Sequence, residues 1–157
     1  DAEVVNAGVS GDTTAGGLAR IDWALTPEAD AMIVALGGND LLRGIPPESS
    51  RANLEGILAR LEAAGLPALV VGLEAPGNYG PDFKAAFDAM YPDLAREYGA
   101  LHEESFLAPL VAEVPIGEAR VRYMQGDGIH PNRDGVRVIV EAIGPRVAEL
   151  VARAGAS

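Results

Sequence analysis

Residues 31–36 have the sequence AMIVAL, and residues 68–73 have the sequence ALVVGL. Each is a short apolar run, which is typical of a strand that is buried on both faces of a parallel sheet. Two weaker candidates of the same kind are Glu3–Ala7 and Ala100–Phe106. Four strands are therefore predicted, and Ala31–Leu36 and Ala68–Leu73 define the fold.

Longer segments with apolar residues at helical spacing alternate with these strands. The predicted helices are Thr14–Leu25, Pro47–Ala64, Pro81–Tyr98 with a kink or break at Pro92, and Arg133–Ala154. This alternation predicts an α/β fold in which a parallel sheet is covered by helices. In an open sheet of this type, ligands bind beyond the carboxyl ends of the strands. The loops that follow the strands are therefore the place to look for a site.

The composition fits one globular domain spanning residues 1–157, of which 48% are hydrophobic and 22% are charged. A net charge of −11 predicts repulsion of nucleic acid and of anionic membranes. Since the chain has no cysteine, covalent chemistry would need an oxygen nucleophile. No apolar run approaches the roughly 20 residues of a membrane-spanning helix, so stable membrane insertion is not expected.

A polar loop, Gly126-Asp127-Gly128-Ile129-His130-Pro131-Asn132, precedes the last predicted helix. Asp127 lies three residues before His130 and can turn its carboxylate onto the imidazole. Such a contact fixes the tautomer of a general base and stabilises the imidazolium, as in the orienting half of a catalytic triad. The alternative is an Asx-type turn in which Asp127 only shapes the loop.

Two further loops carry potential oxyanion donors. Asn39, in Gly37-Gly38-Asn39-Asp40, can direct its side-chain amide into the crevice. Gly11, in the stretch 9–14 (VSGDTT), can present a backbone N–H, while Asp12 or Thr13 caps the first helix. Taken singly, each motif also fits a simple turn or cap. Ser10 lacks the sequence context of a nucleophilic serine.

Together, Gly11 before Asp-Thr, Asn39 in Gly-Gly-Asn-Asp, and Asp127-x-x-His130 occur in the order and approximate spacing of three sequence blocks of the SGNH (GDSL-type) serine hydrolases. The chain resembles the arylesterase and multifunctional thioesterase/lysophospholipase branch of that family, which it also matches in residues 6–13 and 76–80. The resemblance implies a three-layer α/β/α sandwich with a five-stranded parallel sheet in flavodoxin-like order. It also implies a Ser-His-Asp triad.

The same resemblance implies a role for individual residues. His130 is expected to be the general base, Asp127 its orienting partner, and Gly11 and Asn39 the oxyanion donors. The acyl pocket is expected to lie near Ala75, Tyr79 and Ile129. No metal or organic cofactor is implied. The expected substrates are small carboxylic esters or thioesters with short or medium acyl chains, or aryl esters.

The Gly-Asp-Ser-Leu segment that carries the family's nucleophile is not found in this sequence, whose serines are Ser10, Ser49, Ser50, Ser105 and Ser157. We therefore expect a strand-turn-helix segment with the nucleophile to precede Asp1. In the 2-1-3-4-5 strand order, its strand would lie between Glu3–Ala7 and Ala31–Leu36. Without it, unpaired backbone groups at two buried edges would each cost about 1–3 kcal/mol. We therefore do not expect residues 1–157 to fold alone in this topology, since domains are stable by only about 5–15 kcal/mol.

Three other functions are weighed against ester hydrolysis. A non-catalytic module that binds a small molecule or glycan would keep the crevice without a nucleophile. A carbohydrate O-acetylesterase is disfavoured because 5% aromatic residues leave little material for a sugar-stacking surface. A metal-dependent hydrolase is disfavoured because His102-Glu103-Glu104-Ser105 lacks the second histidine of H-E-x-x-H. Localisation in the periplasm or outside the cell is favoured by the family resemblance alone.

Overall fold

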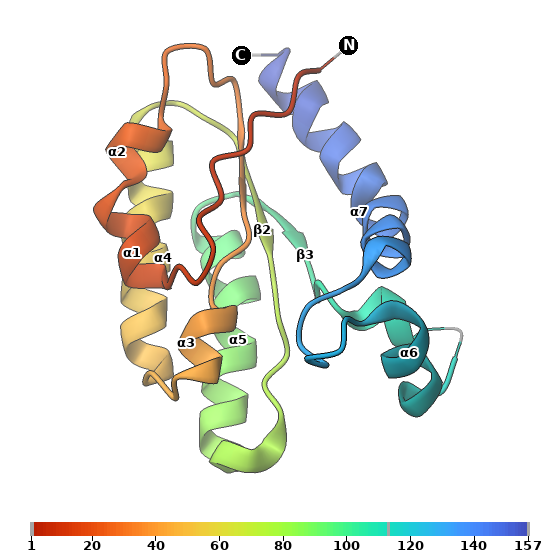
Figure 1. Ribbon diagram of the computed structural model, residues 1–157. Helices are drawn as coiled ribbons and strands as arrows, with labels where there is room; N and C mark the ends of the chain where they lie inside the picture. Colours follow the sequence, from red (N-terminus) through yellow and green to blue (C-terminus); the bar gives the residue numbers. More distant parts are fainter. Residues whose placement is uncertain (1, 113, 157) are drawn as a thin grey trace.

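The sheet has three parallel strands. The computed structural model (Figure 1) describes residues 2–112 and 114–156, and its strands are β1 (Met32–Val34), β2 (Ala68–Val71) and β3 (Leu101–Glu103) in the order β1-β2-β3. All four residues of β2 are buried, because this central strand is covered on both faces. The strands predicted at 31–36, 68–73 and 100–106 are confirmed, each shorter than predicted.

The strand predicted at Glu3–Ala7 is wrong. Residues 2–9 form neither helix nor strand, and the Val4 and Val5 side chains are 81% and 74% exposed. Apolar residues become a strand only when a neighbouring strand takes up their backbone hydrogen bonds, and within the described residues β1 pairs with β2 alone. The described part of the chain therefore holds three strands and not the four predicted from the sequence.

One face of the sheet is covered by α4 (Pro47–Ala63) and α5 (Pro81–Glu97). The larger hydrophobic core lies here and includes Leu54, Leu58 and Phe87, each no more than 2% exposed. The break predicted at Pro92 does not occur, since α5 continues through it. Burial of Tyr91 and Leu94 close to Pro92 offsets the roughly 3 kcal/mol that an interior proline costs.

The predicted helix Thr14–Leu25 is two helices, α1 (Thr14–Ala19) and α2 (Ile21–Ala24). The break is at Arg20, whose backbone leaves the helical conformation. Its guanidinium donates to the Asp12 carboxylate (2.7 Å) and to the carbonyl of Ala7 (2.6 Å). These two hydrogen bonds connect the end of α1 to the segment that precedes this helix.

The opposite face of the sheet is covered by α7 (Arg133–Ala154), whose bounds agree with the prediction. Leu150 of α7 packs with Leu69, Val71 and Leu101 in a second, smaller core. Figure 1 shows α7 (blue) and the α4–α5 pair on the two sides of the strands. The predicted three-layer α/β/α arrangement is therefore confirmed.

Four short elements were not predicted: α3 (Gly38–Leu42), α6 (Ile116–Tyr123), and the 3₁₀ turns η1 (Gly77–Tyr79) and η2 (Ala108–Val111). Each lies in a connection that follows the carboxyl end of a strand. The connections therefore have more regular structure than their glycine and proline content indicated. None of the described helices is both long and apolar enough to cross a membrane.

Candidate active site

The candidate residues lie in loops at one edge of the sheet. The α3 helix follows β1 and η1 follows β2; in Figure 1, α3 lies below the start of α1, and the turn that leads into α5 is the lowest part of the molecule. The loop before α7, which contains Asp127 and His130, turns at about the height of α3 in this view. This agrees with the rule that ligands bind beyond the carboxyl ends of parallel strands.

Asp127 contacts the His130 imidazole directly, with Oδ2 2.7 Å from Nδ1. Its other oxygen, Oδ1, accepts hydrogen bonds from the backbone N–H groups of Ile129 (2.9 Å) and His130 (3.0 Å). The turn and the imidazole contact, weighed as alternatives from the sequence, thus occur together. One carboxylate oxygen shapes the loop while the other orients the ring.

The hydrogen bond from the His130 ring, followed by those from the two backbone N–H groups, lowers the pKa of Asp127 well below its ordinary value. The carboxylate is therefore ionised at neutral pH and acts as an acceptor only. An acceptor at Oδ2 requires the proton of a neutral imidazole to lie on Nδ1, which leaves Nε2 free to take up another proton. With 67% of the His130 side chain exposed, that nitrogen is open to a reacting group.

The Asp127–His130 loop is held at both ends. Met124 and Pro131 form an antiparallel bridge, and the Gln125 N–H donates to the His130 carbonyl (2.8 Å). The Asn132 side chain caps α7 by accepting from the N–H groups of residues 134 and 135. Sequence reasoning missed Asn132, although an asparagine directly before a helix is a recognised N-cap signal.

The backbone N–H of Gly11 is available to donate a hydrogen bond. Within residues 2–112 and 114–156 no acceptor takes its N–H, while its carbonyl accepts from Arg43 (3.0 Å). Its φ of 77° lies in the left-handed region, which favours glycine, although a Cβ there would meet no atom within 4 Å. The predicted cap of α1 is Thr13, whose side chain accepts from the Gly16 N–H, whereas Asp12 pairs with Arg20.

Asn39 is the second residue of α3 and not part of an irregular turn. Its side-chain amide is half-buried and bonds to none of the described residues. The preceding turn is tightly enclosed: Gly37 has a φ of 114°, and a Cβ on it would lie 2.2 Å from the Tyr91 hydroxyl. That hydroxyl donates to the carbonyl of Leu36 (3.1 Å), and this hydrogen bond stabilises the turn.

The three predicted pocket residues differ in what they can offer a ligand. Ala75 is 2% exposed, and its backbone N–H and carbonyl bond to Asp88 (2.7 Å) and Lys84 (2.8 Å). It therefore provides a rigid wall and little side-chain surface. Tyr79 (42% exposed, with its ring centroid 4.8 Å from that of Phe83) and Ile129 (45% exposed) are available at the surface.

No serine hydroxyl among the described residues bonds to His130. Ser50 donates to Asp40 (3.0 Å) and Ser105 accepts from a backbone N–H (3.3 Å). Ser10 and Ser49 are exposed on other segments, and Ser157 lies outside the described residues. The described residues also hold no cluster of three or more His, Cys, Asp or Glu side chains suited to a metal ion.

A groove of about 410 Å³ lies beside the His130 loop, lined by residues that include Arg120, Gln125 and Gly128. Arg120 and Arg122 in α6 and Arg133 in α7 flank this loop, and none of the three has a carboxylate partner among the described residues. Glu118, Asp127 and Asp134 lie in the same stretch of sequence, so the three arginines balance its acidic side chains.

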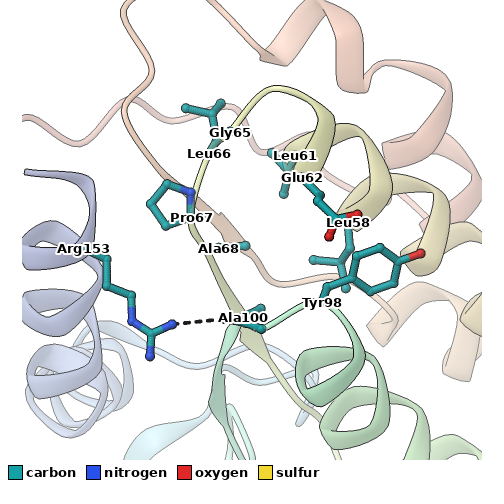
Figure 2. Close-up of a pocket in the computed structure, with 11 residues that line it drawn as sticks. Leu58, Leu61, Glu62, Gly65, Leu66, Pro67, Ala68, Tyr98, Ala100 and Arg153 are labelled. Atoms are coloured by element: carbon teal, nitrogen blue, oxygen red, sulfur yellow. Dashed lines mark hydrogen bonds between the residues drawn. The ribbon is translucent and has the colours of Figure 1, made fainter. Parts of the chain in front are cut away.

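A second hollow, of about 290 Å³, lies at the opposite end of the strands (Figure 2). Pro67 and Ala68 at the start of β2, and Ala100 just before β3, line it. Arg153 crosses its edge and donates to the carbonyl of Gly99 (3.0 Å). This hollow is therefore separate from the residues that were singled out from the sequence.

Known proteins resemble this chain over almost its whole length. It is 38% identical to "Thioesterase 1/protease 1/lysophospholipase L1" of Escherichia coli K12, with 94% of this chain and 68% of that protein covered. It is also 38% identical to "Esterase TesA" of Pseudomonas aeruginosa, with coverage of 96% and 72%. The chain thus spans about 70% of the length of these relatives.

The fold has close counterparts among solved structures. The crystal structure of TesA superimposes with a TM-score of 0.83 at 36% identity, covering 96% of this chain and 80% of the other. AlinE4, described as a SGNH-hydrolase family esterase, gives a TM-score of 0.72 at 42% identity, with coverage of 94% and 76%. The family model described as "GDSL-like Lipase/Acylhydrolase family" matches residues 1–138. The chain therefore belongs to the GDSL-like lipase/acylhydrolase family.

Proposed function

We propose that this chain is the main part of a single-domain ester hydrolase that cleaves carboxylic esters or thioesters through an acyl-serine intermediate. The nucleophilic serine lies on a segment outside the present sequence. The observation that carries the proposal is the contact of the Asp127 carboxylate with His130 Nδ1, which leaves Nε2 of an exposed imidazole free. The names of the relatives, which include thioesterase, esterase and arylesterase, support the reaction class.

In the proposed mechanism His130 Nε2 takes the proton of the serine hydroxyl as the serine oxygen attacks the carbonyl carbon. The carbonyl oxygen becomes an oxyanion, which accepts hydrogen bonds from the Gly11 N–H and the Asn39 side-chain amide. Asp127 stays ionised and stabilises the imidazolium. When the intermediate collapses, the alcohol or thiol leaves with the proton from His130, and an acyl-serine ester remains.

Water completes the cycle. His130 Nε2, now neutral, removes a proton from a water molecule as the water attacks the acyl-serine carbonyl. The same donors stabilise the second oxyanion, and the serine leaves with the proton from His130. The products are a carboxylic acid and the alcohol or thiol. Tyr79 and Ile129 are the exposed side chains proposed to contact the acyl group.

The test is labelling of the natural full-length protein with a fluorophosphonate, followed by mapping of the modified residue by mass spectrometry. The proposal expects one adduct on a serine outside residues 1–157. It also expects the His130→Ala variant to be labelled far more slowly, because the serine then lacks its base. If wild-type protein is neither labelled nor able to hydrolyse p-nitrophenyl esters, the binding-module alternative replaces this proposal.

A further inference from the structure

Asp40 is a fully buried carboxylate, with 0% of its surface exposed. Oδ2 accepts from the backbone N–H of Thr14 (2.8 Å), and Oδ1 accepts from the hydroxyls of Thr14 and Ser50 (3.0 Å for Ser50). The Thr14 hydroxyl in turn accepts from the Asn53 amide (3.0 Å). No Lys, Arg or His among the described residues forms an ion pair with Asp40.

Burying a carboxylate without a cation is costly, and its neutral donors offset that cost only if their geometry is kept. The groups that donate hydrogen bonds to Asp40 come from two helices. Ser50 belongs to α4, whereas Thr14 is the first residue of α1, which begins just after Gly11. Asp40 itself is adjacent to Asn39. The carboxylate therefore joins the two chain segments that carry the proposed oxyanion donors, although Thr14 and Asp40 are 26 residues apart in sequence.

A second contact joins the same two segments on the outside. Arg43, directly after α3, donates to the carbonyl of Gly11 (3.0 Å). The α3 segment thus holds the Gly11 loop at two points, through the buried Asp40 and the exposed Arg43. Neither the Gly11 N–H nor the Asn39 amide has a partner of its own among the described residues. Their relative position therefore depends on these ties.

We infer that Asp40 is a positioning residue that sets the spacing of the Gly11 N–H and the Asn39 amide, and so the strength with which they bind an oxyanion. The inference rests on the proposed function. Asp40 does not touch the substrate; it acts through Thr14 and through its neighbour in the chain. Removal of one oxyanion donor typically costs about 100- to 1,000-fold in kcat, so a displaced donor should cost about 10- to 100-fold.

A matched pair of variants separates positioning from stability. Thr14→Val and Ser50→Ala each remove one hydroxyl bond to the same oxygen of Asp40, and Thr14→Val also removes the acceptor of the Asn53 amide. Only Thr14→Val loosens the Gly11 segment. We expect Thr14→Val to lower kcat several-fold or more with little change in KM, and Ser50→Ala to lower the thermal midpoint without lowering kcat. Equal effects on kcat from the two variants would overturn the inference.

Asp40 itself is tested with Asp40→Ala and Asp40→Asn. Asparagine can keep three contacts here, since its oxygen accepts from the Thr14 N–H and its amide donates to the two hydroxyl oxygens, which reverses the direction of those two bonds. We expect Asp40→Ala to lower kcat about 10- to 100-fold and to weaken binding of a boronic acid, a tetrahedral oxyanion mimic, by a similar factor. Asp40→Asn should restore most of both losses. If Asp40→Ala does not fold, the Thr14 and Ser50 pair decides.

Nuclear magnetic resonance provides a readout that needs no activity. In the natural protein without substrate, Thr14→Val should shift or broaden the Gly11 amide and Asn39 side-chain amide signals, whereas Ser50→Ala should leave them in place. If wild-type protein is inert toward esters, the proposed function fails, and these spectra still test the positioning role. If wild-type protein is active and neither kcat nor the spectra respond to Thr14→Val, the positioning role alone fails.

Discussion

Replacement of Asp127 by asparagine isolates the orienting role of the carboxylate, because the structure dictates which way the new amide must face. Oδ1 accepts two backbone N–H groups, from Ile129 (2.9 Å) and His130 (3.0 Å). Only an oxygen can accept them, so the asparagine oxygen must take that place. Its NH₂ group is then directed at His130 Nδ1, which must become an acceptor, and the ring proton moves to Nε2.

The expected result is a large loss of activity with little change in structure. With Nε2 protonated, the imidazole cannot accept the serine proton, and the equivalent substitution in a Ser-His-Asp enzyme lowers kcat by about 10,000-fold. The loop should persist, because both backbone hydrogen bonds to residue 127 are retained. Asp127→Ala, in contrast, removes those two bonds as well and should loosen the loop in addition to lowering kcat.

Two measurements check this reasoning on the natural protein. Steady-state hydrolysis of a p-nitrophenyl ester gives kcat, and long-range ¹H–¹⁵N correlation spectra of the imidazole show which ring nitrogen carries the proton. The orienting role of Asp127 is refuted if Asp127→Asn keeps more than about a tenth of wild-type kcat, given the loss expected for the wrong tautomer. It is also refuted if the variant still has its ring proton on Nδ1.

Three further predictions concern stability and titration. Leu54, 1% exposed in the larger core, should cost about 2–5 kcal/mol of unfolding free energy when replaced by alanine, measured by urea titration. Gly72→Ala should cost about 1–3 kcal/mol or more in the same assay, because the new Cβ would lie 2.4 Å from the backbone oxygen of Glu104. Because the pKa of Asp127 is lowered in the folded state, its stabilising effect is present above the ordinary value of 3.8 and is lost only as the pH falls through the lower, folded value. Its carboxyl ¹³C signal should therefore titrate below pH 3.8, and His130→Ala should move the midpoint upward.

Features with local causes were predictable from the sequence. The helix Arg133–Ala154 has the predicted bounds, because its apolar spacing and end signals lie within the segment itself. The contact between Asp127 and His130 was foreseen because only three residues separate them. The strand Ala68–Val71 was evident from its uninterrupted apolar run, since a strand covered on both faces has no polar side.

Features that depend on distant partners were not predictable. Residues 3–7 have the pattern of a strand, but the described chain provides no strand beside them, and their apolar side chains remain exposed. Gly37–Asp40 has the composition of a loop, yet Gly38 begins a short helix that is held by hydrogen bonds from Tyr91 and Thr14. The sequence of these short segments does not indicate which distant residues will contact them in the folded protein.

The sequence by itself determined the α/β class, the order of its main elements and the identity of the Asp127–His130 pair, because periodicity and short-range spacing are properties of the chain alone. Only the tertiary structure revealed that Asp40 is buried and bonded to Thr14, and that the Gly11 and Asn39 segments are thereby joined. The physical reason is that the local sequence of Asp40, a carboxylate next to an asparagine, is equally compatible with exposure to water and with burial. Folding alone decides whether donors from another element surround it.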